Sequence, residues 1–296
     1  MKRNKKNTIF INFIKKTQRG FTLVELLVAI TIITLLAGLI FVNLSDARKK
    51  ASIAKSLEFS QTVNNVIGSY LVGVWGFNEG SGNLVSDTSG YNHAGTWNGS
   101  ADWVANTITQ LGWAGNFNNS YVDIGDPGNG ILDFGTGDFS LSAWFYLPSL
   151  PGSWKSIISK GASSNNVIGY GMEISDDNRI TCSIRATGGS NQRVEGSVPK
   201  AGIWHYAVCV FDRDNKVFVY LDGKESTNAT ITGNTGSVDN TFSFRIGAHS
   251  GNGNSATQRF SGQIDEIRIF NNNLVASEIQ KNYASGEGRH ENLTRK

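Results

Sequence analysis

A single carboxylate stands inside a long apolar run near the start of the chain. Residues 21–42 contain no charged side chain except that of Glu25. A carboxylate within a bilayer is costly unless it finds a partner, so an ionisable residue in such a segment indicates a functional role by default. The chemistry open to Glu25 is pairing with an opposite charge in surroundings of low dielectric constant.

The residues before this run are strongly basic. Residues 1–20 carry seven Lys and Arg side chains and no acid, and they end at Gly20, directly before Phe21. Positive charges before an apolar span keep that end in the cytoplasm and send the rest of the chain outward. The whole chain has a net charge of +3, so the chain without these seven charges has −4. The basic character is therefore a targeting effect and gives no case for nucleic-acid binding.

The spacing of Gly20, Phe21 and Glu25 resembles the class III signal of type IV prepilins and pseudopilins. In that family a prepilin peptidase cuts after the glycine, and the new terminal phenylalanine is methylated. In that family, the glutamate contacts the N-terminal amine of a neighbouring subunit during assembly. The resemblance implies these roles here, with other pilin subunits as partners. It also implies residence in the cytoplasmic (inner) membrane with the head outside, followed by assembly into an extracellular pilus or pseudopilus.

Two simpler interpretations of this segment compete. A secretory signal peptide is cut after its apolar region, at small residues, whereas here the best site precedes that region. An ordinary membrane anchor also fits, because about 20 apolar residues span a bilayer. An anchor, however, needs neither Glu25 nor the Gly20-Phe21 pair at the polar boundary.

Amphipathic spacing after residue 44 predicts that the helix continues to about Tyr70.

The composition changes near Gly73. From there the chain is rich in Gly, Asn, Ser and aromatic residues in short alternating runs, which predicts an antiparallel sandwich. Asp222 and Gly223 predict a type I′ hairpin turn, because both of its central residues need positive φ. The expected strands are Gly73–Asn78, Tyr121–Ile124, Phe139–Leu147, Ser156–Lys160, Ile168–Ile174, Arg179–Arg185, Trp204–Phe211, Lys216–Leu221, Phe242–Gly247 and Gly262–Phe270.

Several of these segments resemble laminin G-like jelly rolls of the concanavalin A-like lectin/glucanase superfamily, in the family's order. The matching pieces are Val74–Gly82, Asp87–Gly90, Tyr121–Gly125, Phe139–Trp144, Ile157–Gly161, Trp204–Val208, Tyr220–Gly223 and Gly262–Phe270. The resemblance implies a closing helix near Ala276–Ala284. The expected fold is mainly β, an antiparallel jelly-roll sandwich carried on a long N-terminal α-helix. We expect a leader at 1–20, an assembly helix at 21–71, the sandwich at 72–288 and a flexible tail at 289–296.

The superfamily includes glucanases, which need two carboxyl groups flanking the scissile bond. The sequence lacks their Glu-x-Asp-x-x-Glu spacing, and Asp265 and Glu266 are adjacent, so a strand would point them to opposite faces. We therefore expect no enzyme. The resemblance also implies a structural calcium held by Asp265, by backbone oxygens and by a residue of the first-strand segment, where the sequence offers Asn78 or Glu79. The alternative is that Asp265 caps a turn or pairs with Arg268.

Aromatic side chains on loops are the candidates for ligand contact. Trp97 and Trp154 lie near predicted loops, so they are the predicted ligand-binding residues. The two cysteines lie outside the cytoplasm in this interpretation, which permits a disulfide. Cys182 is in phase with the apolar side chains of its strand, whereas Cys209 is out of phase with Trp204 and its alternating neighbours. That pattern favours two free cysteines packed as small apolar side chains, with a disulfide as the alternative.

An assembly helix joined to a recognition fold predicts the function. We expect a type IV pilin-like filament or secretion-system subunit that displays a lectin-like domain for adhesion to glycan or protein. The alternatives are a structural major pilin or pseudopilin whose sandwich has no ligand, or a membrane-anchored lectin-like protein.

Overall fold

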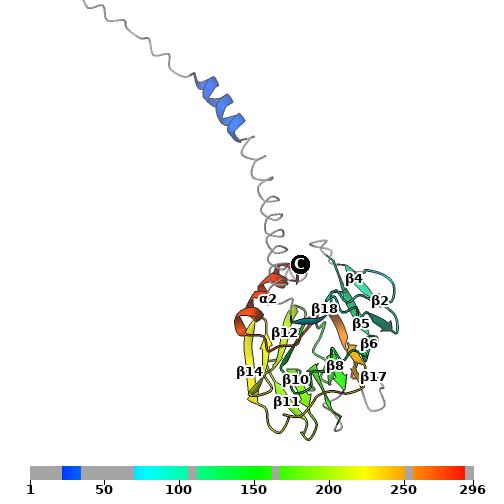
Figure 1. Cartoon of the computed structure of the whole chain (residues 1–296). Coiled ribbons are helices and arrows are strands. Elements are labelled where there is room, and N and C mark those ends of the chain that lie inside the picture. The colour runs from blue at the N-terminus through cyan, green and yellow to red at the C-terminus, as the bar shows by residue number, and fades with distance from the viewer. Residues whose placement is uncertain (1–21, 35–69, 106–111, 162–166, 251–255, 291–296) are drawn as a thin grey trace, which may run out of the picture. The chain divides into compact units, whose positions relative to one another are not determined.

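The computed structural model describes residues 22–34, 70–105, 112–161, 167–250 and 256–290 (Figure 1). The chain divides into two compact units, Met1–Ala54 and Lys55–Lys296. The first contains helix α1, residues 23–34. The second contains strands β1–β18 and helix α2. The predicted cleavage site at Gly20 and Phe21, and the predicted helix beyond residue 34, lie outside the described residues.

Helix α1 begins with a reciprocal cap. The Glu25 carboxylate accepts hydrogen bonds from the backbone N–H of Thr22 at 2.9 Å and from its hydroxyl at 2.8 Å. In return, the Glu25 N–H donates to the Thr22 hydroxyl oxygen at 3.3 Å. This capping box satisfies backbone donors that the first turn of a helix leaves unpaired, so Glu25 has a local role that its spacing alone did not indicate. Within the described ranges, no helix combines the length and the apolar character needed to cross a membrane.

The second unit is built from two large antiparallel sheets (Figure 1). Sheet A contains, in order across the sheet, β14 (Lys224–Thr230), β13 (Lys216–Leu221), β12 (Trp204–Phe211), β7 (Phe139–Tyr146), β18 (Ser261–Phe270), β5 (Trp113–Asn118) and β4 (Trp103–Ala105), with β1 (Leu71–Trp75) also paired to β18. Sheet B contains β11 (Gln192–Glu195), β10 (Ile180–Arg185), β9 (Gly169–Ile174), β8 (Lys155–Gly161), β15 (Phe244–Ile246), β6 (Tyr121–Gly125), β3 (Gly95–Asn98) and β2 (Leu84–Val85). A small pair, β16 (His249–Ser250) and β17 (Ala256–Thr257), lies outside both sheets.

Each strand expected from the sequence is present, and the antiparallel sandwich is confirmed. The turn between β13 and β14 is confirmed as well, because Asp222 has a φ of 52° and Gly223 a φ of 73°. Apart from β5, the strands that were not expected are short or polar. β14 is an example, since its sequence Lys224–Thr230 carries no large apolar side chain and is mostly exposed.

Two apolar clusters stabilise this unit. The larger lies between the sheets and contains large buried aromatic side chains such as Trp75, Phe139 and Phe211. The smaller lies on the opposite face of sheet A, beneath α2 (Ala276–His290), and includes Trp144 and Tyr206. The central strands of sheet A are therefore buried on both faces, in the manner of a sheet covered by a helix.

The cysteines are a correction to the sequence analysis. Cys182 and Cys209 form a disulfide that joins β10 of sheet B to β12 of sheet A, with a Cα–Cα distance of 5.6 Å. The expectation of free cysteines is wrong because β12 has two buried faces. Phe211 and Cys209 face the core between the sheets, whereas Tyr206 and Val208 face the cluster under α2. The large alternating side chains of β12 marked the helix-covered face.

Helix α2 begins at Ala276, as expected, but continues to His290. It therefore runs beyond the expected end at 284 and into the segment expected to be a flexible tail. At its start, the N–H of Val275 donates to the Glu278 carboxylate at 3.0 Å, which replaces half of a capping box where no Ser or Thr is present. At its end, the His290 ring is buried and stacks on Trp144, with 4.1 Å between ring centroids.

Candidate functional site

Trp97, a predicted ligand-binding residue, lies in the core. Its side chain is 4% exposed, and its ring centroid lies 4.7 Å from that of Phe117. The segment around it forms strand β3, in which Trp97 is paired with Val122 and alternates with exposed neighbours. A side chain buried between two sheets cannot serve as a surface platform, so this prediction is wrong.

Trp154, the other predicted ligand-binding residue, is partly exposed just before β8. The guanidinium carbon of Arg193, on β11, lies 4.5 Å from the centroid of its ring. This is the geometry of a cation–π contact. Trp154 therefore stays a candidate ligand-binding residue. In the structure it contacts Arg193, a partner that the spacing in the sequence did not predict.

The residues predicted to hold calcium have other partners. The Asp265 side chain is buried; one carboxylate oxygen lies 3.1 Å from Nε2 of His290, and the other accepts the N–H of Glu266 at 2.7 Å. Asn78 is exposed, and its side-chain oxygen lies 3.5 Å from the backbone nitrogen of Trp113. Among the described residues, no three His, Cys, Asp or Glu side chains form a group that could hold a metal. A cation at Asp265 would have to displace His290, so this donor set fits calcium poorly, and the calcium site stays a prediction.

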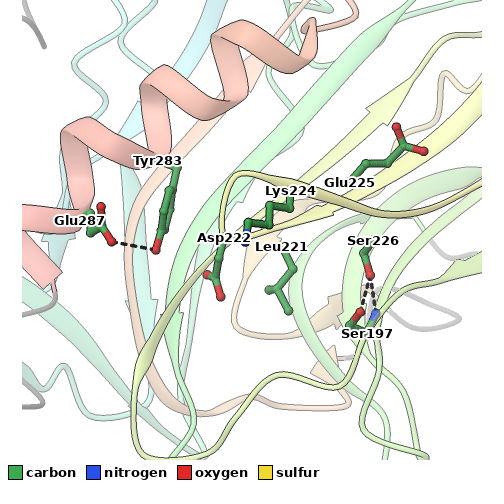
Figure 2. A pocket seen from close by; sticks show the side chains of 8 residues that line it. All are labelled: Ser197, Leu221, Asp222, Lys224, Glu225, Ser226, Tyr283 and Glu287. Atoms are coloured by element: carbon green, nitrogen blue, oxygen red, sulfur yellow. Dashed lines mark hydrogen bonds between the residues drawn. The ribbon is translucent and has the colours of Figure 1, made fainter.

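A polar hollow lies between α2 and the β13–β14 hairpin (Figure 2). Its volume is about 550 Å³. The lining side chains combine hydroxyls, carboxylates, one ammonium and one aromatic ring, and they come from Ser197, Leu221, Asp222, Lys224, Glu225, Ser226, Tyr283 and Glu287. None of them was singled out by sequence reasoning as a site residue, because the hollow forms only where the C-terminal helix meets a hairpin some sixty residues earlier in the chain.

The lining of the hollow is held in place by specific contacts. The Tyr283 hydroxyl donates to the Glu287 carboxylate at 3.2 Å, as Figure 2 shows. The Tyr283 ring packs on the hairpin turn, where a Cβ on Gly223 would lie only 3.0 Å from it. The Asp222 carboxylate accepts the Tyr206 N–H at 3.0 Å and lies 2.8 Å from Nδ1 of His205.

These contacts define what the hollow can do. Three of its side chains are acids and one is a lysine, so it is suited to a hydroxyl-rich or cationic ligand. Ligand sites in proteins are concave and combine an apolar or aromatic surface with a few placed polar groups. The Tyr283 ring and the surrounding carboxylates meet that description, although the lining is more polar than that of most small-molecule sites.

The family models identify both parts of the chain. A model described as the concanavalin A-like lectin/glucanases superfamily matches residues 115–280. The chain belongs to this superfamily. A second model, the prokaryotic N-terminal methylation motif, matches residues 15–41. The resemblance of both segments is thereby confirmed: a prepilin-type motif and a lectin-like sandwich stand in one chain. No curated protein matches the sequence significantly.

Two similar solved structures are binding domains. The binding domain of Paraclostridial Mosquitocidal Protein 1 has a TM-score of 0.58 at 15% identity, covering 74% of this chain and 53% of that one. The binding domain of botulinum neurotoxin DC, solved with rat synaptotagmin II, has a TM-score of 0.55 at 16% identity, covering 74% and 52%. The chain thus spans about half the length of these structures.

A third similar structure is matched over almost its whole length. Domain 4 of AbnA, a GH43 extracellular arabinanase from Geobacillus stearothermophilus, was solved with arabinotriose. Its TM-score is 0.52 at 20% identity, covering 71% of this chain and 97% of that one. At such identities the likeness establishes the fold alone.

Proposed function

We propose that this protein is a pilin-like subunit of an extracellular filament or pseudopilus, and that its sandwich recognises a glycan or protein surface. One observation carries the proposal: a prepilin methylation motif at residues 15–41 and a lectin-like domain at residues 115–280 belong to the same chain. The partners would be a prepilin peptidase, other pilin subunits and the inner membrane before assembly, with the sandwich outside the cell.

Recognition by the sandwich is supported by the relatives and by the hollow. Among the structures with this fold, one was solved in complex with arabinotriose and another in complex with rat synaptotagmin II. Function resides in the site rather than in the fold, so the argument for this chain rests on the concave polar surface beside Tyr283. We assign no catalytic role, because the carboxylate spacing of glucanases is absent from the sequence.

The pilin part of the proposal is tested by mass spectrometry of the protein from its native envelope. We expect a chain that starts at Phe21 and carries one methyl group on its terminal amine. A chain that still starts at Met1 would refute processing. The protein would then be a membrane-anchored lectin-like protein with no place in a filament.

The recognition part is tested with the full chain in detergent on a glycan array and on whole cells. We expect Glu287→Gln and Lys224→Ala to weaken binding, because both side chains line the hollow. The matched control is Asp214→Asn, an exposed acid in the turn between β12 and β13. Absence of binding by the unaltered protein would refute recognition and leave a structural subunit.

A structural calcium at Asp265 and Asn78 is a separate part of the proposal. Calcium takes several oxygen ligands, so its binding would require His290 to leave the Asp265 carboxylate. The melting temperature in calcium and in EGTA tests this. An identical value in both would refute the site.

A further inference from the structure

Buried polar atoms without partners gather on the outer face of sheet B. Glu173 is 2% exposed, and its Oε2 has no hydrogen-bond partner among the described residues. The same holds for the hydroxyls of Ser156 and Ser183 and for the side-chain oxygen of Gln258. Such atoms are destabilising, and native proteins contain few of them. Their concentration in one place therefore needs an explanation.

The strand register brings these atoms together. Ser156 on β8 is paired with Glu173 on β9, and Ser183 on β10 is paired with Gly171. The backbone N–H of Ser156 donates to the carbonyl of Gln258 at 2.8 Å. A Cβ placed on Gly171 would lie 3.2 Å from the Ser183 hydroxyl and 3.6 Å from Oε1 of Glu173. The Ser183 hydroxyl and the Glu173 carboxylate thus both lie close to Gly171, where a Cβ would also lie 3.0 Å from the Ile158 carbonyl oxygen.

Arg193 and Trp154 form a cover over this position. Arg193 belongs to β11 and Trp154 precedes β8, and the strand order places β10 and β9 between them. Neighbouring strands are about 4.8 Å apart, so the contact between Arg193 and the Trp154 ring spans the two strands that carry Glu173 and Ser183. Because Arg193 is exposed and Trp154 partly exposed, this cover faces solvent.

Two buried titratable groups that interact with Arg193 have shifted pKa values. Burial raises the pKa of Glu173 to about 7, although the positive charge of Arg193 acts in the opposite direction. Burial also lowers the pKa of His249 to about 4, with the charges of Arg193 and Arg245 acting in the same direction. At neutral pH, His249 is therefore uncharged and Glu173 is partly protonated.

We propose that Glu173, Arg193 and Trp154, with the hydroxyls of Ser156 and Ser183, form a binding site for a neutral sugar unit. Two adjacent sugar hydroxyls would form hydrogen bonds with the site. One hydroxyl would donate to Oε2 of Glu173, and the other would accept from the Arg193 guanidinium. The sugar ring would lie on the Trp154 face that Arg193 covers in the free protein. The inference rests on the proposed recognition function, but the site is separate from the hollow of Figure 2.

A buried water is the competing occupant. Ordered water commonly satisfies buried polar groups that have no protein partner, and it could serve Glu173 and the two serines. A buried water would not explain why the exposed Arg193 guanidinium reaches across two strands to lie on the Trp154 ring. An aromatic ring beside hydrogen-bonding groups at the surface is instead the composition of a ligand site.

The test is calorimetric titration of the mature full chain in detergent. The probes are maltotriose, arabinotriose and a galactose trisaccharide, with a trisaccharide of uronic acids as the acidic comparison. We expect at least one neutral trisaccharide to bind, and we expect Glu173→Gln and Arg193→Ala each to weaken it at least tenfold. Asp214→Asn, an exposed acid in the turn between β12 and β13, is the matched control and should bind as the unaltered protein does.

Several outcomes would overturn this inference, and three of them come directly from the titration. They are unchanged affinity in Glu173→Gln and Arg193→Ala, binding of the acidic trisaccharide alone, and no binding of any probe. Arg193 is exposed, so Arg193→Ala remains informative even if Glu173→Gln misfolds. Loss of sugar binding in Lys224→Ala alone would refute the Glu173 site while supporting the hollow. Binding to cells or arrays without any effect of the Glu173 or Arg193 changes would likewise refute this site and leave the proposed function intact.

Discussion

The disulfide between Cys182 and Cys209 allows a prediction with a calculable magnitude. The two residues are 27 positions apart and connect the two sheets. A cross-link removes loop-closure entropy from the unfolded chain, and for a loop of this length the chain-entropy relation gives about 3.6 kcal/mol at 25 °C. The double variant Cys182→Ala, Cys209→Ala should therefore lose about 3–4 kcal/mol of unfolding free energy.

Urea unfolding followed by tryptophan fluorescence measures this loss. The matched control is the unaltered protein with its disulfide reduced, because it keeps both sulfur atoms and changes only the covalent link. Both forms should lose similar stability relative to the oxidised protein. For a unit of this size, each kcal/mol corresponds to roughly 2–4 °C, so the melting temperature should fall by about 7–14 °C.

Two results would refute the reasoning. Two reactive thiols in the denatured but unreduced protein would show that the bond does not form. A reduced protein as stable as the oxidised one would show that the bond contributes nothing. Destabilisation of the double alanine variant without a matching effect of reduction would assign the loss to the missing sulfur atoms, which are fully buried.

Three further predictions concern single residues. Glu25→Ala should be processed normally but fail to enter filaments, and immunoblots of sheared filaments measure this. Thr22→Ala removes only the cap at a cost of about 1 kcal/mol, so if it blocks assembly equally, capping rather than charge pairing is the role of Glu25. Trp97→Ala should lower the unfolding free energy of the sandwich, measured in urea, by about 3–5 kcal/mol, because it leaves a cavity in the core. Ligand affinity should not change. A loss of affinity in folded protein would contradict the assignment of Trp97 to the core. The pKa of Glu173 rises from 4.5 to about 7 on folding, so the folded state binds this proton more tightly than the unfolded chain does. The resulting stabilisation is about 3 kcal/mol. It is complete below pH 4.5 and is lost as the pH rises through 7. Glu173→Gln should remove that loss from urea titrations at pH 5 and pH 8, and an unchanged pH dependence would refute it.

Much of the fold was predictable because its signals are local. Alternation of apolar and polar residues marked segments such as Trp204–Phe211 and Lys216–Leu221 as strands. Positive φ at Asp222 and Gly223 followed from residue type, since a tight hairpin turn needs residues that tolerate that conformation. These features depend on neighbours a few positions away, which the sequence displays directly.

Edge strands and burial were less predictable. Strand β14 has no apolar alternation, and it is a strand because β13 supplies a hydrogen-bonding partner across the hairpin. Trp97 was mistaken for a surface residue because strand β3 is too short to reveal its pairing with β6. Partner strands, rather than intrinsic preference, decide whether such segments are extended and which side is buried.

The sequence by itself determined that a prepilin-type segment precedes a lectin-like sandwich, because the leader, the apolar run and the strand motifs are contiguous patterns. Only the tertiary structure decided which faces of β12 are buried, and hence that Cys182 and Cys209 are bonded. It alone joined Tyr283 to the β13–β14 hairpin and set Arg193 over the Trp154 ring. These sites combine side chains from strands and helices distant in sequence, so their geometry arises only when the sheets pack and the chain returns to cover them.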